Sequence, residues 1–470
     1  APGKLVCRFV ASEWSGYGGN SGGVGMSDTS GYDSYGAKSG SLVNGVGTNP
    51  VSRTGMPTML KWVAQDASNE GIGIPNVFGS TVKTTSLNGK VGLWVYIEGT
   101  TSYSIVVELS TSSAFTNSLK VTWSAAITRP GWNFLVFVMR NPQAYVVGSG
   151  VSEYHPEGVI AEANGTGADS NIKDNPIANI RIYTPTASTT TPAYFDSLWT
   201  DFSSRAQYML GFDAIGGNII QAAAPLMRHK SYVAVNHYYI DSASKRIVVD
   251  YSGASVWDEY YDSLGWAVVN HTATHIPGTI GSPSMGTLTA PGEIAYELMA
   301  MKQALISRGY TRGLNFYVSP NSSTSPLAER VIGDIGYVFQ RHGIGNAFVP
   351  VTPWGIPNPR TCGGIGIGSA TSYWRRTTGG VSTQLTTGLQ DIANAKAAIV
   401  DVAIDYGATI MPFTHGVEIT GDDGSGTQTP TDPNLCKLSF FRKFMEYLDQ
   451  KEDAGLIDGL EGPDALWYGS

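Results

Sequence analysis

The chain shows two different patterns of apolar and polar positions. Up to about residue 200, apolar segments of strand length are separated by runs of Gly, Ser, Thr and Asn. Segments of this length and spacing, with no helical repeat between them, are typical of an all-β domain. This layout predicts a β-sandwich of jelly-roll type over residues 1–202. We expect strands at 91–98, 103–109, 119–123, 132–138, 178–183 and 193–199.

After this point, apolar runs of strand length alternate with helical segments. The helix expected at 291–308 is the clearest, because four apolar residues recur on one face: Ile294, Leu298, Met301 and Leu305. Strands that alternate with helices form parallel sheets, and such sheets place their chemistry at the carboxyl ends of the strands. We expect strands at 207–213, 231–235, 266–269, 314–318 and 408–413, and helices at 218–230, 255–264, 291–308, 387–405 and 435–450.

Residues with metal and acid–base chemistry follow several of these strand ends. His271 and His275 follow the strand at 266–269, and two histidines four residues apart share one face if the segment is helical. Neutral imidazole suits a borderline ion such as zinc. Asp213 ends the first strand, and His415 follows the last. A histidine pair alone is common at protein surfaces, but convergence at one sheet edge favours a metal site.

Composition narrows the classes of function. The chain has 470 residues, a formal net charge of -8 and 14% charged residues, and it lacks a basic run, which argues against a nucleic-acid partner. No apolar run reaches the roughly 20 residues of a membrane-spanning helix, so no membrane partner is expected. The three cysteines do not form a disulfide framework. A surface rich in Ser, Thr, Asn and Gly is common in extracellular proteins, so we expect a secreted protein or a virion tail component. Because residues 1–3 show neither Met nor a signal peptide, we expect a processed, trimmed or partial chain.

Four segments follow one another in a definite order between residues 205 and 465: Gly211–Ala214 (GFDA), His271–His275 (HTATH), Tyr317–Pro320 (YVSP) and Met411–His415 (MPFTH). In this order they resemble the motifs of the metal-dependent polysaccharide deacetylases, carbohydrate esterase family four. The resemblance implies a distorted (β/α) barrel over residues 203–470. It also implies metal-dependent hydrolysis of acetyl groups from a polysaccharide.

The resemblance implies a role for each residue of the site. His271 and His275 would hold a divalent metal, most readily zinc, with nickel, cobalt or manganese as alternatives. Asp213 would be the base that takes a proton from water, or a metal ligand instead, and His415 would protonate the leaving group. Five further residues would contact the substrate or the oxyanion: Tyr317, Pro320, Asn321, Trp354 and Arg360.

Two positions depart from the family pattern. Ala214 stands where the family has a second aspartate that binds the metal, and a methyl group cannot ligate. The arginine that usually supports the base is absent beside Pro320, so Arg312 or Arg360 is expected to replace it.

Two functions of different classes follow. The first is an esterase that acts on an acetylated polysaccharide such as a capsule, peptidoglycan, chitin or acetyl-xylan. The second is a non-catalytic glycan-binding or receptor-recognition protein on a degenerate deacetylase scaffold, for example in a phage tail. A glycosidase is disfavoured because no paired carboxylates are evident.

The sandwich has two expected roles, carbohydrate binding or oligomerisation. A homo-oligomer is expected, and it would be a trimer if the chain is a phage tail protein. For sugar binding, aromatic residues of the N-terminal loops would stack on pyranose rings: Trp14, Tyr17, Tyr32 and Tyr35.

Overall fold

The computed structural model describes part of the chain. Up to residue 204 it describes 4–8, 39–43, 59–63, 68–74, 90–98, 104–110, 118–123, 128, 131–138, 146–147, 151–152, 159–163, 179–186 and 193–200. Beyond that point it describes 205–213, 218–236, 238–240, 247–249, 254–275, 285–320, 324–342, 349–350, 362–368, 374–378, 381–385, 391–432 and 434–468. No helix among these residues is long and apolar enough to cross a membrane.

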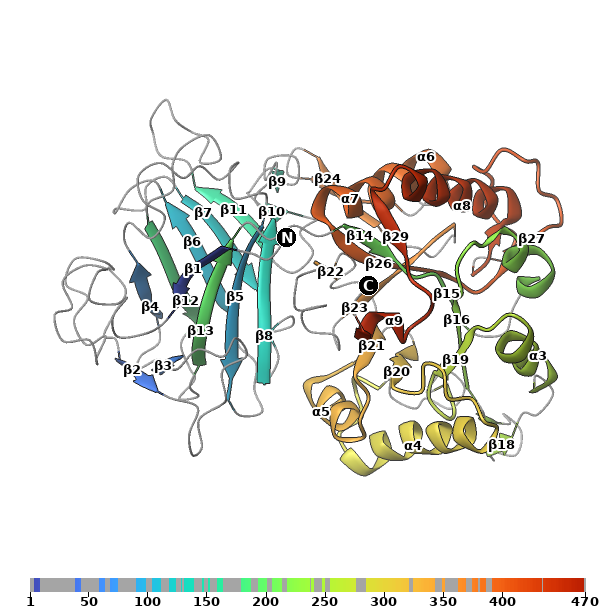
Figure 1. Ribbon diagram of the computed structural model, residues 1–470, viewed down its shortest axis with the longest axis horizontal. Coiled ribbons are helices and arrows are strands. Elements are labelled where there is room, and N and C mark those ends of the chain that lie inside the picture. The colour runs from blue at the N-terminus through green and yellow to red at the C-terminus, as the bar shows by residue number, and fades with distance from the viewer. Residues whose placement is uncertain are drawn as a thin grey trace. The chain divides into compact units, whose positions relative to one another are not determined.

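The chain divides into two compact units, of which the first contains Ala1–Ser204. Its described part contains two larger sheets of antiparallel strands (Figure 1) and the short antiparallel pair of β9 and β10. One sheet has the order β2-β3-β13-β5-β8, with β1 beside β13, and the other has the order β11-β7-β6-β12-β4. The strands are β1 (Lys4–Arg8), β2 (Ser39–Val43), β3 (Met59–Val63), β4 (Ser68–Ile74), β5 (Lys90–Ile97), β6 (Ile105–Ser110), β7 (Ser118–Trp123), β8 (Gly131–Val138), β9 (Val146–Val147), β10 (Val151–Ser152), β11 (Val159–Ala163), β12 (Asn179–Thr186) and β13 (Ala193–Thr200).

The central strands of the first unit carry its apolar core. Val95 and Ile97 on β5 are fully buried, as are Val107 and Leu109 on β6. The six strands expected from the sequence are present as β5, β6, β7, β8, β12 and β13, with small shifts at their ends. The jelly-roll order of the unit stays a prediction. The aromatic residues expected to bind sugar lie outside the described residues: Trp14, Tyr17, Tyr32 and Tyr35.

The second unit contains a closed barrel. In its described part, seven parallel strands follow one another in the order β15-β16-β19-β20-β21-β23-β26, and β26 pairs again with β15. The barrel expected after residue 203 is therefore present, while its deacetylase type stays a prediction. Strands β14 and β29 extend the sheet beside β26, and β22 joins β26 in the antiparallel sense. The strands are β14 (Ala206–Tyr208), β15 (Gly211–Asp213), β16 (Tyr232–Val235), β19 (Ala267–Asn270), β20 (Phe316–Val318), β21 (Phe339–His342), β22 (Val349–Pro350), β23 (Cys362–Gly366), β26 (Ala408–Thr414) and β29 (Ile457–Gly459).

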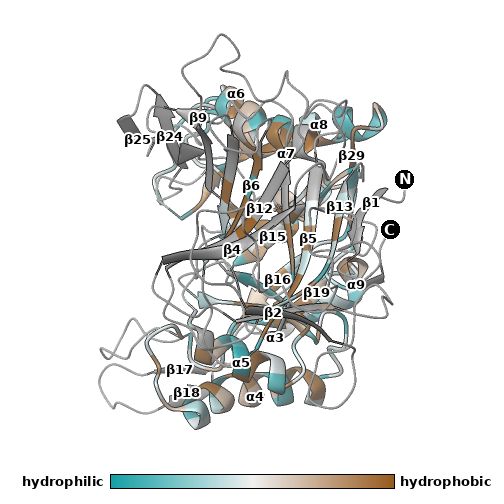
Figure 2. Cartoon of the chain, turned by 90° about the vertical axis from the view of Figure 1, so that its left-hand side faces the viewer, coloured by the Kyte–Doolittle hydropathy of each residue, from teal (hydrophilic) through white to brown (hydrophobic). Residues whose placement is uncertain are grey.

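Helices surround this barrel, with α4 and α5 on one side and α6, α7 and α8 on the opposite side (Figure 1). The four apolar residues predicted on one face of α4 are all fully buried: Ile294, Leu298, Met301 and Leu305. Figure 2 shows both hydrophilic and hydrophobic positions along α4, as expected for a helix that is buried on one face. The helical elements are η3 (Ile219–Ala223), η4 (Ala224–Leu226), α3 (Ala254–Asp258), η5 (Glu259–Ser263), α4 (Pro291–Ser307), α5 (Pro326–Asp334), α6 (Ile392–Ala395), η9 (Lys396–Asp401), α7 (Val402–Tyr406), α8 (Leu438–Asp453) and α9 (Ala465–Tyr468). Short strand pairs complete the description: β17 (Tyr238–Ile240) with β18 (Ile247–Val249), β24 (Trp374–Thr378) with β25 (Val381–Leu385), and β27 (Val417–Glu418) with β28 (Cys436–Lys437).

Three predicted helices differ from the observed ones. The helix expected at 435–450 is observed at Leu438–Asp453, because Cys436–Lys437 forms β28. The helix expected at 218–230 ends at Leu226, because Met227 already has an extended backbone. The helix expected at 387–405 begins after Asp391, whose side chain caps it by accepting a hydrogen bond from the Ala393 N–H.

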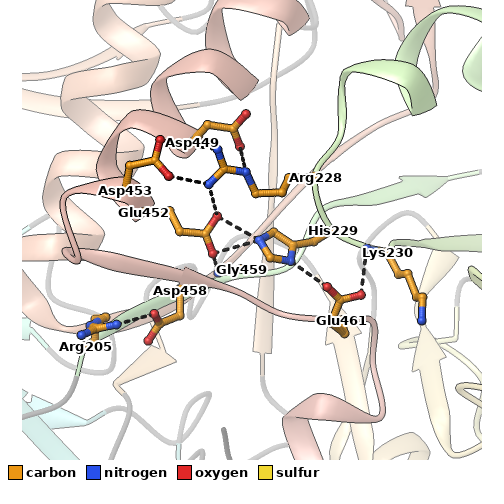
Figure 3. Close-up of polar contacts among 10 residues, drawn as sticks. All are labelled: Arg205, Arg228, His229, Lys230, Asp449, Glu452, Asp453, Asp458, Gly459 and Glu461. Atoms are coloured by element: carbon orange, nitrogen blue, oxygen red, sulfur yellow. Dashed lines mark hydrogen bonds and ion pairs between the residues drawn. The ribbon is translucent and has the colours of Figure 1, made fainter.

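A polar network joins the residues before β16 to the C-terminal segment of the second unit (Figure 3). Nδ1 of His229 lies 2.8 Å from Oε1 of Glu461, and Nε2 lies 2.9 Å from both carboxylate oxygens of Glu452. The backbone of Gly459 approaches the same imidazole, because a Cβ there would lie 2.1 Å from His229 Cδ2. The network therefore holds the end of α8 and the segment after β29 against the start of β16.

The charge state of His229 decides how strongly this network holds. Partial burial disfavours the charged imidazole, but the hydrogen bonds to Glu452 and Glu461 outweigh burial, so the pKa of His229 is raised above its ordinary value of 6.5. A raised folded-state pKa means that the imidazolium stabilises the fold fully below the unfolded pKa. This stabilisation is lost as the pH rises through the folded pKa.

We expect His229→Gln to lower the free energy of unfolding by about 2 kcal/mol near pH 6, because the variant cannot form charged hydrogen bonds to the two carboxylates. Urea unfolding of the wild type and the variant should show that this difference shrinks as the pH rises. Asp334→Asn is the control, since its pair with Arg330 is largely exposed and should contribute less than about 1 kcal/mol. A difference that stays constant with pH would contradict the charged state of His229.

Candidate functional site

Four polar side chains come from the carboxyl ends of different barrel strands. Asp213 is the last residue of β15, and His271 directly follows β19. Arg341 lies near the end of β21, and His415 directly follows β26. The charge on Asp213 acts on His271, His275 and Arg341, and His415 acts on both Asp213 and His275. The barrel therefore brings together the acid and the three histidines that the sequence placed at strand ends.

The site contains a buried ion pair. Arg341 Nη2 donates a hydrogen bond to Asp213 Oδ2, and both side chains are almost completely buried. The guanidinium carbon lies 4.0 Å from the centre of the Phe413 ring. Gly364 on β23 leaves the space for this arrangement, since a Cβ there would lie 2.9 Å from Arg341 Cδ and 3.0 Å from the Phe413 ring.

Asp213 is ionised in this setting. Its burial alone would raise the pKa, but the charge of Arg341 and its hydrogen bond outweigh burial, so the pKa of Asp213 falls below its ordinary value of 3.8. Oδ2 is paired with Arg341, whereas Oδ1 is buried and has no hydrogen-bond partner in the described structure. A buried carboxylate oxygen without a partner is costly unless a ligand satisfies it.

His271 is held as a neutral imidazole with a defined tautomer. Its Nδ1 lies 2.8 Å from the carbonyl oxygen of Val318, and a carbonyl can only accept, so the proton sits on Nδ1. Burial is the main cause that lowers the pKa of His271, to about 3. The ring therefore keeps a lone pair on Nε2 at neutral pH. A backbone carbonyl that fixes the tautomer in this way is typical of metal-binding histidines.

His275 lies beside His271, but not for the reason expected from the sequence. The centres of the two rings are 4.8 Å apart. The segment between them is not helical, because Thr272 has a φ of 68° and His275 a φ of 56°, both in the left-handed region. Burial is the main cause that lowers the pKa of His275, so this ring is also neutral at neutral pH.

The donor types fit a divalent ion. Two neutral imidazoles and a carboxylate oxygen without a partner are the kinds of ligand that zinc binds, and they are Nε2 of His271, the ring of His275 and Oδ1 of Asp213. As they stand, no three His, Cys, Asp or Glu side chains in the described part of the chain are close enough together to hold one ion. Ala214, which replaces the family's second aspartate, lies outside the described residues.

Of the five residues predicted to contact the substrate or the oxyanion, the structure describes Tyr317 and Pro320. The side chain of Tyr317 points out of the barrel and packs between α4 and α5, so only its backbone is near the site. Pro320 is buried and has no N–H, and the N–H of the preceding Ser319 already donates to the Arg341 carbonyl 2.9 Å away. The other predicted residues lie outside the described part: Asn321, Trp354 and Arg360.

The arginine expected to support Asp213 was Arg312 or Arg360, of which Arg360 lies outside the described residues. Arg312 does not reach Asp213, because its guanidinium lies 3.4 Å above the Tyr261 ring and donates to the Trp266 carbonyl. Arg341 pairs with Asp213 instead. No motif marks Arg341, although its place two residues after the apolar Val338–Phe339 could have indicated a strand.

The fold and the site define a closed parallel barrel with an acid and three histidines at the carboxyl ends of its strands. No protein-family model and no curated protein matches the chain. Among solved structures, the chain is similar to a Clostridium thermocellum endo-1,4-β-D-xylanase solved with xylohexaose, at 11% identity and a TM-score of 0.29, over 91% of this chain and 97% of the other. It is similar to an agarase at 7% identity and a TM-score of 0.25, over 84% of this chain and 94% of the other. A match to an exo-β-agarase, at 13% identity and a TM-score of 0.25, covers 36% of this chain and only 23% of that one. Likenesses this weak assign neither a family nor an activity.

We expect Arg341→Met to lower the free energy of unfolding by about 3–5 kcal/mol, because it leaves the Asp213 carboxylate buried without a counter-charge. Adding Asp213→Asn to the same chain should restore part of the loss, since the uncompensated charge is then gone. Urea unfolding of the single and double variants measures both effects. A loss no larger than that of Arg330→Met, which breaks an exposed pair, would show that the buried pair is not needed.

Proposed function

We propose that the second unit hydrolyses acetyl groups from a polysaccharide with the help of a divalent metal. The observation that carries this proposal is the donor chemistry of His271, which lies beside His275 and within electrostatic reach of Asp213. His271 is neutral, with its Nδ1 proton donated to the Val318 carbonyl. Nitrogen donors prepared in this way, next to an ionised carboxylate, favour metal-assisted hydrolysis over chemistry that needs a protonated histidine.

His271, His275 and Asp213 would hold the metal, which is zinc by preference, with nickel, cobalt or manganese as alternatives. When bound, such an ion supplies a Lewis acid that polarises an acetyl carbonyl and acidifies water. Asp213 has one oxygen available, because Arg341 occupies Oδ2. Through Oδ1 it serves either as metal ligand or as base at a given moment. Its lowered pKa makes it a weak base and therefore favours the ligand role.

His415 is the candidate acid for the leaving group. It directly follows β26, its side chain is only partly buried, and it interacts electrostatically with Asp213 and His275. From this position it would donate a proton to the departing amine or alcohol. For the oxyanion we propose the backbone N–H of Asn321, since Pro320 has no N–H and the Ser319 N–H donates to the Arg341 carbonyl. Trp354 and Arg360 are proposed as substrate contacts.

The polysaccharide would be reached by an extracellular protein, secreted or carried on a virion tail. The two antiparallel sheets of the first unit support a jelly-roll sandwich that binds carbohydrate or mediates assembly into a homo-oligomer. The alternative is a glycan-binding protein that has lost catalysis. Ala214 favours this alternative, because the position where the family supplies a metal-binding aspartate has a methyl group.

We expect the purified protein to release acetate from at least one acetylated polysaccharide among capsule, peptidoglycan, chitin and acetyl-xylan. Treatment with a chelator should abolish release, and added zinc should restore it, because the metal supplies the Lewis acid. Acetate in the supernatant is the measurement. Binding of these glycans without any acetate release, with or without metal, would instead support the non-catalytic alternative.

Metal content tests the ligand assignment separately from activity. We expect His271→Ala to bind zinc about 100-fold more weakly than the wild type or worse, because the variant lacks one of the proposed metal ligands. Calorimetric titration of zinc into the metal-free protein measures the affinity. His229→Ala is the matched control, since His229 is bound by Glu452 and Glu461 away from the site. Equal zinc affinity in the wild type and His271→Ala would remove His271 from the ligand set.

A further inference from the structure

The backbone of the segment from His271 to His275 adopts a conformation that is unfavourable without support from other residues. Thr272 has a φ of 68° and His275 a φ of 56°, and neither residue is a glycine. The left-handed region costs a residue with a side chain about 1–2 kcal/mol, and a β-branched residue such as Thr272 is rare there. Such a conformation persists only where surrounding contacts impose it.

The first half of this segment is held by Asn270, the last residue of β19. Its Nδ2 donates to the Leu298 carbonyl at 2.9 Å and to the Tyr337 hydroxyl, and its Oδ1 accepts from the Thr272 N–H at 2.8 Å. These contacts fix the turn at Thr272. They do not reach the second half of the segment, where His275 lies.

The second half is held by Glu297 on α4. Its Oε2 accepts from the Thr274 N–H and its Oε1 accepts from the Thr274 hydroxyl, both at 3.0 Å. Its backbone carbonyl accepts from the Ala273 N–H, also at 3.0 Å. Glu297 therefore binds two consecutive residues directly before His275 through three hydrogen bonds.

A glutamate at this position is unusual in chemical terms. Glu297 lies on the buried face of α4, next to Leu298 and one turn after Ile294, where the helix is otherwise apolar. An ionisable side chain is costly in such a place unless both carboxylate oxygens are satisfied. Here both oxygens bind Thr274. The hydrogen bonds that offset the burial of Glu297 are therefore the same ones that hold Thr274, the residue directly before His275.

We propose that Glu297 is a positioning residue that holds the His275 ring beside His271. It acts through Thr274 and contacts neither a metal nor a substrate. The geometric part of this inference stands on the hydrogen bonds alone, and its consequence for catalysis rests on the proposed function. Residues that orient metal ligands in this way typically affect affinity or activity by about 10- to 100-fold.

The test compares Glu297→Ala, Glu297→Gln and, as matched control, Glu293→Gln. Glu293 lies on the same helix and is exposed. A glutamine at 297 can accept from the Thr274 N–H through its oxygen and donate to the Thr274 hydroxyl through its amide. We therefore expect Glu297→Gln and Glu293→Gln to behave like the wild type, and Glu297→Ala to release His275.

The first measurement is the nuclear Overhauser effect between the two imidazole rings in metal-free protein with labelled histidine. In the wild type the ring centres are 4.8 Å apart, so a cross-peak is expected. It should disappear in Glu297→Ala and persist in the other two variants. The second measurement is kcat/KM for acetate release, which should fall about 10- to 100-fold in Glu297→Ala and recover in Glu297→Gln.

The two measurements separate the two claims. A cross-peak that persists in Glu297→Ala overturns the positioning role, whatever the activity of the wild type. A cross-peak that disappears in Glu297→Ala supports the positioning role even if the wild type releases no acetate, in which case only the proposed function falls.

A second variant covers the case in which Glu297→Ala does not fold. Thr274→Val then takes its place, because it removes the hydroxyl that donates to Glu297 and keeps the N–H that does the same. We expect it to weaken the cross-peak between the two rings and to lower kcat/KM about fivefold. An unchanged cross-peak in Thr274→Val would overturn the positioning role.

Discussion

The second unit depends on one ion pair that crosses the inside of its barrel. Asp213 on β15 and Arg341 on β21 belong to strands that are not neighbours in the sheet, so they meet only because the ring of strands is closed. A charge in such an interior is unfavourable without a partner. The ionised state of Asp213 therefore depends on the closed barrel, which brings Arg341 to it. Gly364 leaves the space that the Arg341 side chain occupies.

This pair also limits the chemistry of the site. With Oδ2 bound to Arg341, the carboxylate has a single oxygen, Oδ1, that has no partner in the described structure. The same counter-charge that keeps Asp213 ionised makes it a poor proton acceptor. Under the proposed function, protons would therefore pass through His415 or water and not through Asp213. The ion pair with Arg341 thus favours a role for Asp213 as metal ligand over a role as base.

The sequence predicted the elements whose apolar residues have a clear period. The strands at β15, β16, β19, β20 and β26 were expected, and so was α4, whose buried face follows the 3.6-residue repeat. Strand β21 was missed because Gln340 and Arg341 make it polar, and β23 was missed because Cys362–Gly366 reads as a glycine-rich loop. Gly364 on β23 leaves the space that Arg341 occupies inside the barrel. A contact across the interior leaves no trace in local spacing, so the sequence pointed to Arg312 or Arg360, and not to Arg341, as the partner of Asp213.

The histidine pair shows how a correct proximity can follow from a wrong local structure. Four-residue spacing brings two side chains together on a helix, but the segment after β19 is a left-handed turn. The rings meet because Asn270 and Glu297 force Thr272 and His275 into conformations that their side chains disfavour. The four-residue spacing therefore says little about why the two rings meet, whereas Glu297 on the buried face of α4 says more. A buried carboxylate whose only side-chain hydrogen-bond partner in the described structure is Thr274, the residue before His275, ties the folding of α4 to the geometry of the site.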